Sequence, residues 1–197
     1  MKKHSIFAFA CLAIFSCNDS DSKTDTTVTS SDTLAVNGTT DTGITTPSTA
    51  ATMPADSATA KFLVKATEGG LAEVACGQVA QNKSVNESVK MFAGMMVSDH
   101  SGVNAQLSML AGQRQVVLPS ETSPENKKMA ADVEKKSGAA FDKAYMDMMV
   151  AAHKKTIGLF EKASGELSDP AVKTLIEQTL PKVKTHLDSA QAIRKRL

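Results

Sequence analysis

Three histidines are the residues of this sequence best suited to chemistry. Each of them, His100, His153 and His186, lies on the apolar face of a different stretch of helical periodicity. A fourth such stretch carries Glu73 on its apolar face. Imidazole nitrogens and carboxylate oxygens are the ligands that a divalent ion takes from the core of a helical bundle. The pattern therefore predicts a metal site built from these four side chains.

The same four residues lie at similar heights along their helices. Each is within about four residues of its helix midpoint, or roughly 6 Å at 1.5 Å per residue. They can therefore meet in one buried polar layer, whichever way the helices alternate. A second interpretation stays open, in which the histidines are structural core residues and Glu73 is their hydrogen-bond partner.

The ligand types favour one ion over two. Three imidazoles and one carboxylate suit a single tetrahedral ion such as zinc. A di-iron site of the ferritin type takes four Glu and two His, with Glu-x-x-His on two helices. Here the residue three positions before each histidine is a valine, namely Val97, Val150 or Val183. The sequence thus favours one zinc or copper ion over a di-iron centre.

Four further side chains are accessory candidates around this layer. Met96 and Met149 stand one helical turn before two of the histidines, so they are either core residues or thioether ligands for copper. Cys76 lies three residues after Glu73 and shares its face, which makes a thiolate ligand conceivable beside an inert buried thiol. Asp99 is a candidate for a supporting contact to a ligand.

Long helices must position these residues. Hydrophobic residues recur with a period of 3.6 from residue 56 onward, and no strand-like alternation occurs. The expected fold is all-α: a four-helix bundle whose long crossover between the second and third long helices carries a short extra helix. The expected helices span residues 56–82, 84–112, 124–137, 139–164 and 170–196.

Start signals support these helix boundaries. Ser84 and Glu87 form the pattern of a capping box at the second helix. Proline follows a capping residue at Ser123-Pro124 and at Asp169-Pro170. Gly69 and Gly70 lie inside the first helix, where they favour the close approach of a neighbouring helix.

The apolar faces predict the bundle core. The expected core positions are Phe62, Ala66, Gly69, Glu73, Cys76 and Ala80 on the first helix; Val85, Val89, Phe92, Met96, His100, Val103, Leu107 and Leu110 on the second; Met146, Met149, His153, Ile157 and Phe160 on the third long helix; and Val172, Ile176, Val183, His186, Ala190 and Ile193 on the last.

The N-terminus has the pattern of a bacterial lipoprotein signal. Residues 1–16 contain a basic start and a short apolar stretch that ends at Ile14-Phe15-Ser16-Cys17. This ending resembles the lipobox, whose Cys is acylated, although Phe15 is bulkier than the usual residue there. A plain secretory signal is the alternative. Residues 17–54 then form a tether rich in Ser, Thr and Asp, whose composition cannot build a core. The helical domain spans 55–197.

This organisation implies a location and excludes some partners. Asn18 follows Cys17 where an inner-membrane retention signal would place Asp, so we expect an outer-membrane lipoprotein facing the periplasm or the cell surface. The membrane is then a partner through the lipid on Cys17, and protein partners remain unidentified. A net charge of +1, with no Trp and one Tyr, disfavours nucleic acid as a partner.

A set of motifs along the domain resembles a known family. The motifs are Phe62-Leu63, Gly70-Leu71-Ala72-Glu73-Val74, Met96-Val97-Ser98-Asp99-His100, Phe141-Asp142-Lys143-Ala144-Tyr145, Leu159-Phe160-Glu161, Leu180-Pro181 and His186-Leu187. In this order they resemble the family called domain of unknown function 4142, over about residues 56–195. The resemblance implies a ferritin-like helical bundle in exported, often membrane-associated bacterial proteins. It supplies no activity.

Two functional hypotheses follow from these observations. The first is a lipid-anchored envelope protein that binds a single metal ion in the bundle core. The second is a non-catalytic structural or protein-interaction module of the envelope, in which the polar layer only fixes the register of the helices.

The lipid anchor makes a direct prediction. We expect Cys17→Ser to release the protein from the membrane fraction and to lower its mass by the mass of the lipid, because the thiol carries the acyl groups. Membrane fractionation, detergent partitioning and intact-mass measurement check this. An unchanged mass and unchanged partitioning would rule out lipidation at this residue.

Overall fold

The computed structural model describes residues 53–197. The expected signal peptide at residues 1–16, the lipidation site Cys17 and nearly all of the tether at 17–54 lie outside the described residues. Within the described part of the chain, no helix is both long and apolar enough to cross a membrane.

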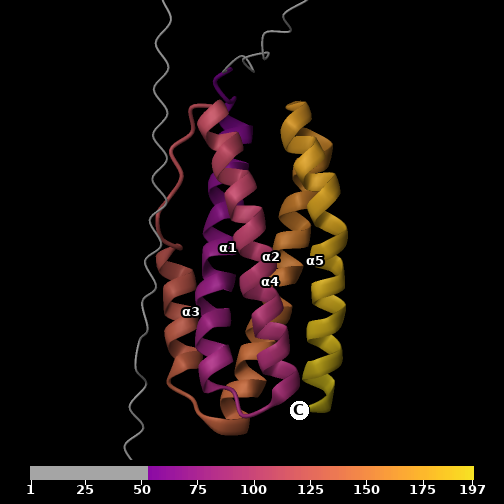
Figure 1. The fold of residues 1–197 in the computed structure, drawn as a ribbon. Helices are drawn as coiled ribbons and strands as arrows, with labels where there is room; N and C mark the ends of the chain where they lie inside the picture. The colour runs from indigo at the N-terminus through magenta and orange to yellow at the C-terminus, as the bar shows by residue number, and fades with distance from the viewer. Residues whose placement is uncertain (1–52) are drawn as a thin grey trace, which may run out of the picture. The chain divides into compact units, whose positions relative to one another are not determined.

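The described residues form helices joined by short connections, which confirms the all-α expectation. The four long elements have similar lengths, and a short fifth element lies in the crossover (Figure 1). They are α1 at Ser57–Lys83, α2 at Glu87–Gln113, α3 at Pro124–Glu134, α4 at Gly138–Glu166 and α5 at Pro170–Arg196.

Side-chain caps begin four of the five helices. The Asp56 carboxylate accepts a hydrogen bond from the Thr59 amide at 2.7 Å, which starts α1. The Asp169 carboxylate accepts from the amides of Ala171 and Val172 in the same way, directly before Pro170. Ser123 caps α3 through the Asn126 amide. These polar residues satisfy amide groups that have no partner within the helix.

The expected capping box at Ser84 is wrong. The side chain of Asn86 caps α2 instead, accepting from the amides of Ser88 and Val89. Ser84 ends α1, where its backbone amide donates to the Ala80 carbonyl. Its hydroxyl accepts from the Asn86 amide within the turn. Asn is as good a cap as Ser, and the turn between the helices needed the extra residues.

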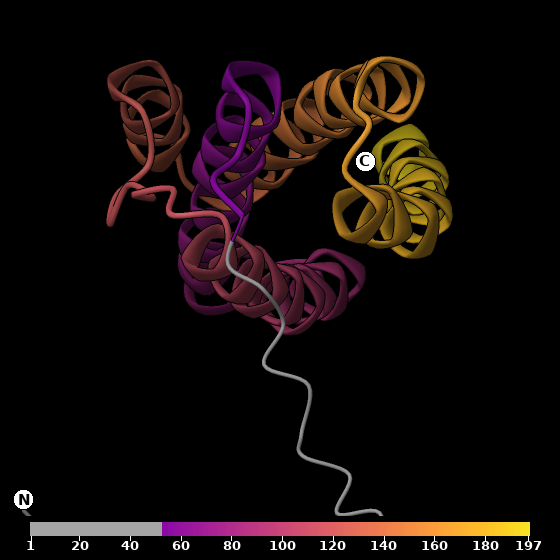
Figure 2. The ribbon, with the colours of Figure 1, turned by 90° about the horizontal axis from the view of Figure 1, so that it is seen from above.

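The long helices form a bundle, with α3 on its outside. Seen along its length, α1 and α2 run antiparallel, as do α4 and α5, while the crossover makes α2 and α4 parallel (Figure 1). Seen from above, α3 lies apart from the four long helices, beside α1 and α4 (Figure 2). The expected four-helix bundle with a crossover helix is therefore confirmed.

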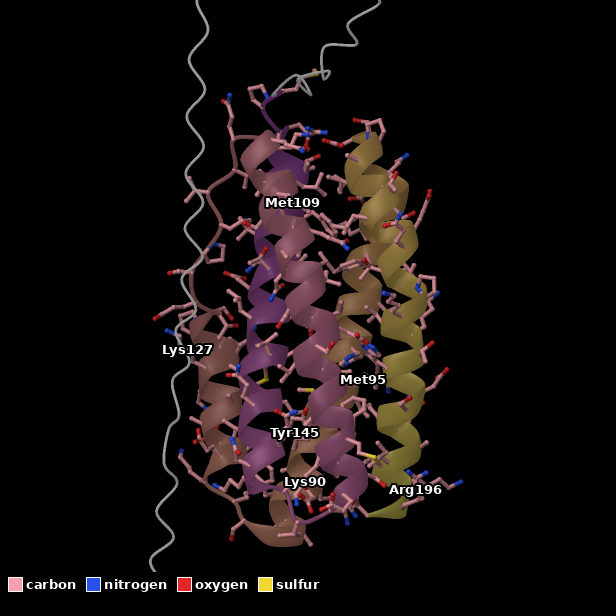
Figure 3. The ribbon with its side chains drawn as sticks, in the orientation of Figure 1. Lys90, Met95, Met109, Lys127, Tyr145 and Arg196 are labelled. Atoms are coloured by element: carbon pink, nitrogen blue, oxygen red, sulfur yellow. The ribbon has the colours of Figure 1, made fainter. Side chains whose placement is uncertain are left out.

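Two apolar clusters fill the bundle. One cluster near the α1–α2 turn includes Val89, Phe92, Met96 and Tyr145 (Tyr145 is labelled in Figure 3). The other cluster, near the opposite end, includes Phe62. On every long helix, the residues of one cluster precede the midpoint and those of the other follow it. A gap between the two clusters remains at mid-height, and polar residues occupy it.

Most of the expected core positions are buried. Val85 is the clear error, because it lies in the turn before α2 and is 66% exposed. Gly69, Val103, Leu110 and Ile157 are only partly buried. The core also includes large residues that the sequence argument missed, namely Leu63, Phe141, Tyr145 and Leu175.

Glycines let α1 lie close to α2. A Cβ added to Gly77 would stand 3.0 Å from the Ala93 carbonyl oxygen and 2.9 Å from Cγ2 of Val97. A Cβ at Gly70 would clash with the Asn104 side chain. Gly69 has no such close neighbour on α2. The expected close approach to α2 is thus confirmed at Gly70 but not at Gly69, and Gly77 provides a second point of close approach.

The core makes a prediction about stability. Leu63 is fully buried, so Leu63→Ala should lower the free energy of unfolding by about 2–5 kcal/mol through lost burial and a residual cavity. Val117 is 91% exposed, so Val117→Ala should change it by less than about 0.5 kcal/mol. Urea unfolding followed by circular dichroism measures both. Equal effects would contradict the assignment of the core.

Candidate metal centre

The polar layer takes one residue from each long helix. Glu73 comes from α1, His100 from α2, His153 from α4 and His186 from α5. All four are buried, with exposed fractions between 0% and 5%. Along each helix, residues of one apolar cluster precede this polar residue and residues of the other cluster follow it. The bundle therefore holds these side chains in a buried layer between two apolar clusters.

The three imidazoles form a compact triangle. Their ring centroids are 5.6 Å apart for His100 and His153, and 5.5 Å apart for each of the other two pairs. One ligand nitrogen from each ring lies within 4.8 Å of those of the other two. This geometry could hold one metal ion between the rings.

Each ring is fixed by a contact through one of its nitrogens. His153 Nδ1 lies 2.8 Å from the Met149 carbonyl oxygen, which can only accept, so Nδ1 carries the proton and donates. His100 Nδ1 lies 3.0 Å from Oε2 of Glu73. His186 Nε2 lies 2.9 Å from Oδ2 of Asp99. A carboxylate or carbonyl on the far nitrogen is the arrangement that orients metal-binding histidines.

The opposite nitrogen of every ring is buried without a partner. Nε2 of His100, Nε2 of His153 and Nδ1 of His186 have no hydrogen-bond partner among the described residues. In a neutral ring whose other nitrogen donates, this nitrogen carries a lone pair. A buried polar atom left unpaired costs about 1–3 kcal/mol. When all three rings are neutral, these nitrogens form an unsatisfied set of acceptors that a cation would fill.

Glu73 holds the rings from the side of α1. Its Oε2 contacts His100, and its Oε1 lies 3.5 Å from Nδ1 of His153 and has no hydrogen-bond partner. The group of side chains close enough to share an ion consists of the three histidines without Glu73. The carboxylate therefore stands as a supporting contact in this geometry, and its role as a fourth ligand stays a prediction.

The charges of the layer are strongly coupled. Burial acts to lower the pKa of His100, but the charge and hydrogen bond of Glu73, with a contribution from Asp99, outweigh it and raise the pKa. Burial acts to raise the pKa of Glu73, but the charge and hydrogen bond of His100 and the charges of the other two histidines lower it. In the absence of metal, Glu73 and His100 thus each stabilise the charged form of the other.

The other two histidines favour the neutral form. Burial lowers the pKa of His153, and the charge of His100 adds to this effect against the opposing influence of Glu73 and the Met149 carbonyl. Burial also lowers the pKa of His186, with the charges of His100 and His153 acting in the same direction against Asp99. Neutral imidazoles are the form that binds a metal ion.

The accessory candidates divide into two groups. Asp99, as expected for a supporting residue, bonds to a histidine, although to His186 on α5 and not to its sequence neighbour His100. Met96 and Met149 are buried in the apolar cluster near the α1–α2 turn. Of these two methionines, Met149 alone bonds to the layer in the described part of the chain, and it does so through its backbone carbonyl.

Cys76 lies outside the group of side chains that are close enough to share an ion. It forms no disulfide within residues 53–197. Burial, followed by the charges of Glu73 and Glu134, raises the pKa of its thiol to about 11. The thiol is therefore protonated at neutral pH.

Sequence reasoning missed one contact of the centre. The Met149 carbonyl fixes the tautomer of His153. Every residue has a carbonyl, so no residue type could have pointed to it. The spacing of four residues on one helix was the available signal, because an i−4 carbonyl lies beneath the side chain of residue i.

Comparisons with known proteins agree with this fold. The sequence profile of the domain of unknown function DUF4142 matches residues 44–193. The chain belongs to the DUF4142 family. The family assignment expected from the motifs is thus confirmed, with a match that begins before the first helix of the DUF4142 bundle. The comparison with curated proteins found no similar chain.

A solved structure shares the architecture of this DUF4142 chain. The crystal structure of a DUF305 fragment from Deinococcus radiodurans superposes with a TM-score of 0.65 at 14% sequence identity. The match covers 73% of the DUF4142 chain and 99% of the fragment. At this identity the likeness extends to the fold alone.

The protonation states make a prediction for the metal-free protein. Unfolded His takes a proton near pH 6.5, whereas buried His153 takes one only at lower pH. Stability should therefore fall as the pH decreases below about 6.5, by at most about 1.4 kcal/mol per pH unit for this group. His153→Phe should make this decline shallower. Urea unfolding between pH 5 and 7.5 with a chelator measures it, and identical slopes would contradict the assignment.

Proposed function

We propose that this protein binds a single transition-metal ion through His100, His153 and His186, and that it does so at the bacterial cell envelope. The convergence of three unpartnered, buried ring nitrogens carries the metal assignment. A purely structural layer would pair these nitrogens with one another or with hydroxyls, because leaving them unpaired costs stability.

Zinc or copper fits the ligands better than iron pairs do. Three neutral imidazoles suit both zinc and copper. A dinuclear iron site needs several bridging carboxylates, and Glu73 is the buried carboxylate in contact with the triad. The carboxylates of Glu73 and Asp99, each bonded to a ligand ring, would offset the two positive charges of one dication.

Three protein ligands leave one tetrahedral position open. Catalytic zinc sites have this composition, whereas structural zinc sites use four protein ligands. Glu73 would close the position if its side chain turned toward the ion, since its Oε1 has no hydrogen-bond partner now. The centre is thus suited to hold an ion that also takes a water molecule or an exchangeable ligand.

The envelope location is supported by the N-terminal sequence. The signal-like residues 1–16, Cys17 and the polar segment 17–54 would tether the bundle to the outer membrane. The alternative function is a non-catalytic structural or interaction module. The contact between Glu73 and His100 favours this alternative, because it satisfies part of the layer without metal.

Metal stoichiometry tests the proposal. The chelator-treated full-length protein, dialysed against zinc or copper, should hold one ion per chain and gain thermal stability. His153→Gln and His186→Gln should lose the ion. Binding should weaken as the pH falls toward 6 and below, and the raised pKa of His100 moves the onset of this loss upward.

A matched pair of variants separates a metal centre from a structural layer. Asp99→Asn removes the carboxylate that holds His186 and should weaken binding about 10–100-fold. Asp188→Asn removes an exposed carboxylate from α5 and should leave binding unchanged. Two ions per chain would overturn the single-ion centre. No bound ion, with His153→Gln altering stability alone, would leave the structural module standing.

A further inference from the structure

Helix α3 covers an open cavity on the side of the bundle. The cavity has a volume of about 780 Å³ and is lined by residues of α1, α3 and α4. Figure 2 shows α3 beside α1 and α4. No residue of α3 is fully buried, although Met129 and Val133 face the cavity. A helix that packed directly on the bundle would bury an apolar stripe. Here Ala130 and Val133 pack against the apolar cluster near the α1–α2 turn, and the space beside them remains open.

Both ends of α3 are attached to α1. Before the helix, the Thr122 hydroxyl donates to the Glu68 carbonyl at 2.7 Å. Asn126, in the first turn, donates to Thr122 at 2.9 Å. At the other end, the Lys83 ammonium donates to the carbonyl of Glu134. These contacts hold the helix over the cavity, so the space is a built feature of the fold.

The cavity has apolar walls, a charged rim and a polar floor. Small and aliphatic side chains such as Ala72, Ala152 and Leu159 line the walls. At the rim, Lys65 pairs with Glu68 and Lys155 faces Glu125, so opposite charges balance there. At the floor lies the buried carboxylate of Glu73.

Glu73 connects this cavity to the metal centre. None of the three histidines lines the cavity, whereas Glu73 lines it and also contacts His100. One carboxylate oxygen is engaged with His100, whereas Oε1 has no hydrogen-bond partner. A buried carboxylate oxygen needs a donor, and Glu73 is the buried carboxylate that lines the cavity.

We propose that the cavity binds a small elongated molecule with an apolar body and a terminal hydrogen-bond donor, a hydroxyl or an ammonium group. The body lies between α3, α1 and α4, and the donor reaches the Glu73 carboxylate. The volume is in the range of small-molecule sites, which combine apolar walls with a few polar groups. A molecule that ends in a carboxylate is disfavoured, because its head group brings no donor to the oxygens of Glu73.

Binding of three matched probes tests the proposal. Octanol, octylamine and octanoate share one chain and differ in the head group. Calorimetric titration of the full-length protein at pH 7.5, with chelator present, should give saturable binding of one octanol or octylamine per chain. Octanoate should bind at least tenfold more weakly. No saturable binding of octanol or octylamine, or equal binding of all three probes, overturns the proposal.

Variants locate the binding. Ala152→Trp fills the cavity from α4 and should weaken octanol binding at least tenfold while metal stoichiometry is unchanged. Ser164→Trp, on an exposed position of the same helix outside the cavity, should bind octanol as the wild type does. Glu73→Gln should abolish the preference for octylamine over octanoate. Wild-type affinity in Ala152→Trp overturns the cavity assignment.

The outcome of the probe titrations does not depend on whether the protein binds a metal ion. The titrations use metal-free protein, so a wild-type chain that holds no metal and still discriminates between the head groups refutes the metal centre alone. A chain that holds one ion but does not bind the probes refutes the cavity assignment alone.

Discussion

Three imidazole rings and one carboxylate share a single cross-section of a bundle that is otherwise apolar, and each needs a polar partner inside it. Two apolar clusters exclude water from the two sides of this layer. The layer is therefore shielded on these two sides, and the hydrogen bonds of its polar groups are made within the bundle. Glu73, Asp99 and the Met149 carbonyl each engage one nitrogen of a ring. The three remaining nitrogens face a space that only a cation or a donor can satisfy.

This constraint fixes the register of the bundle. Every long helix places one histidine or glutamate of the core at mid-height, and a shift of any helix by one turn would move this residue toward an apolar cluster. Local features then act in the same direction. The caps at Asp56, Asn86 and Asp169 determine where helices begin. An ion pair between Arg114 and Asp169 joins the end of α2 to the start of α5.

The crossover between α2 and α4 gives the molecule a second chemical environment. It brings α3 beside α1 and α4, where its contacts leave a cavity above Glu73. Glu73 is therefore common to two sites of different character, a ring of imidazoles and a mostly apolar pocket. A change at the pocket that alters Glu73 would alter the partner of His100, so the two sites are physically linked.

The sequence by itself determined the helices, their order and most of the core, because periodicity, capping residues and prolines act over a few residues. It also placed Glu73, His100, His153 and His186 in one layer, because each of them lies near the midpoint of its predicted helix. Only the tertiary structure decided which contacts each of these residues makes. Asp99 bonds to His186, 87 positions away in the chain, instead of to its neighbour. Glu73 lies to the side of the histidine triangle, and the cavity beneath α3 exists because of how the crossover is attached. Such features depend on the rotation and spacing of packed helices, and no local pattern of residues records them.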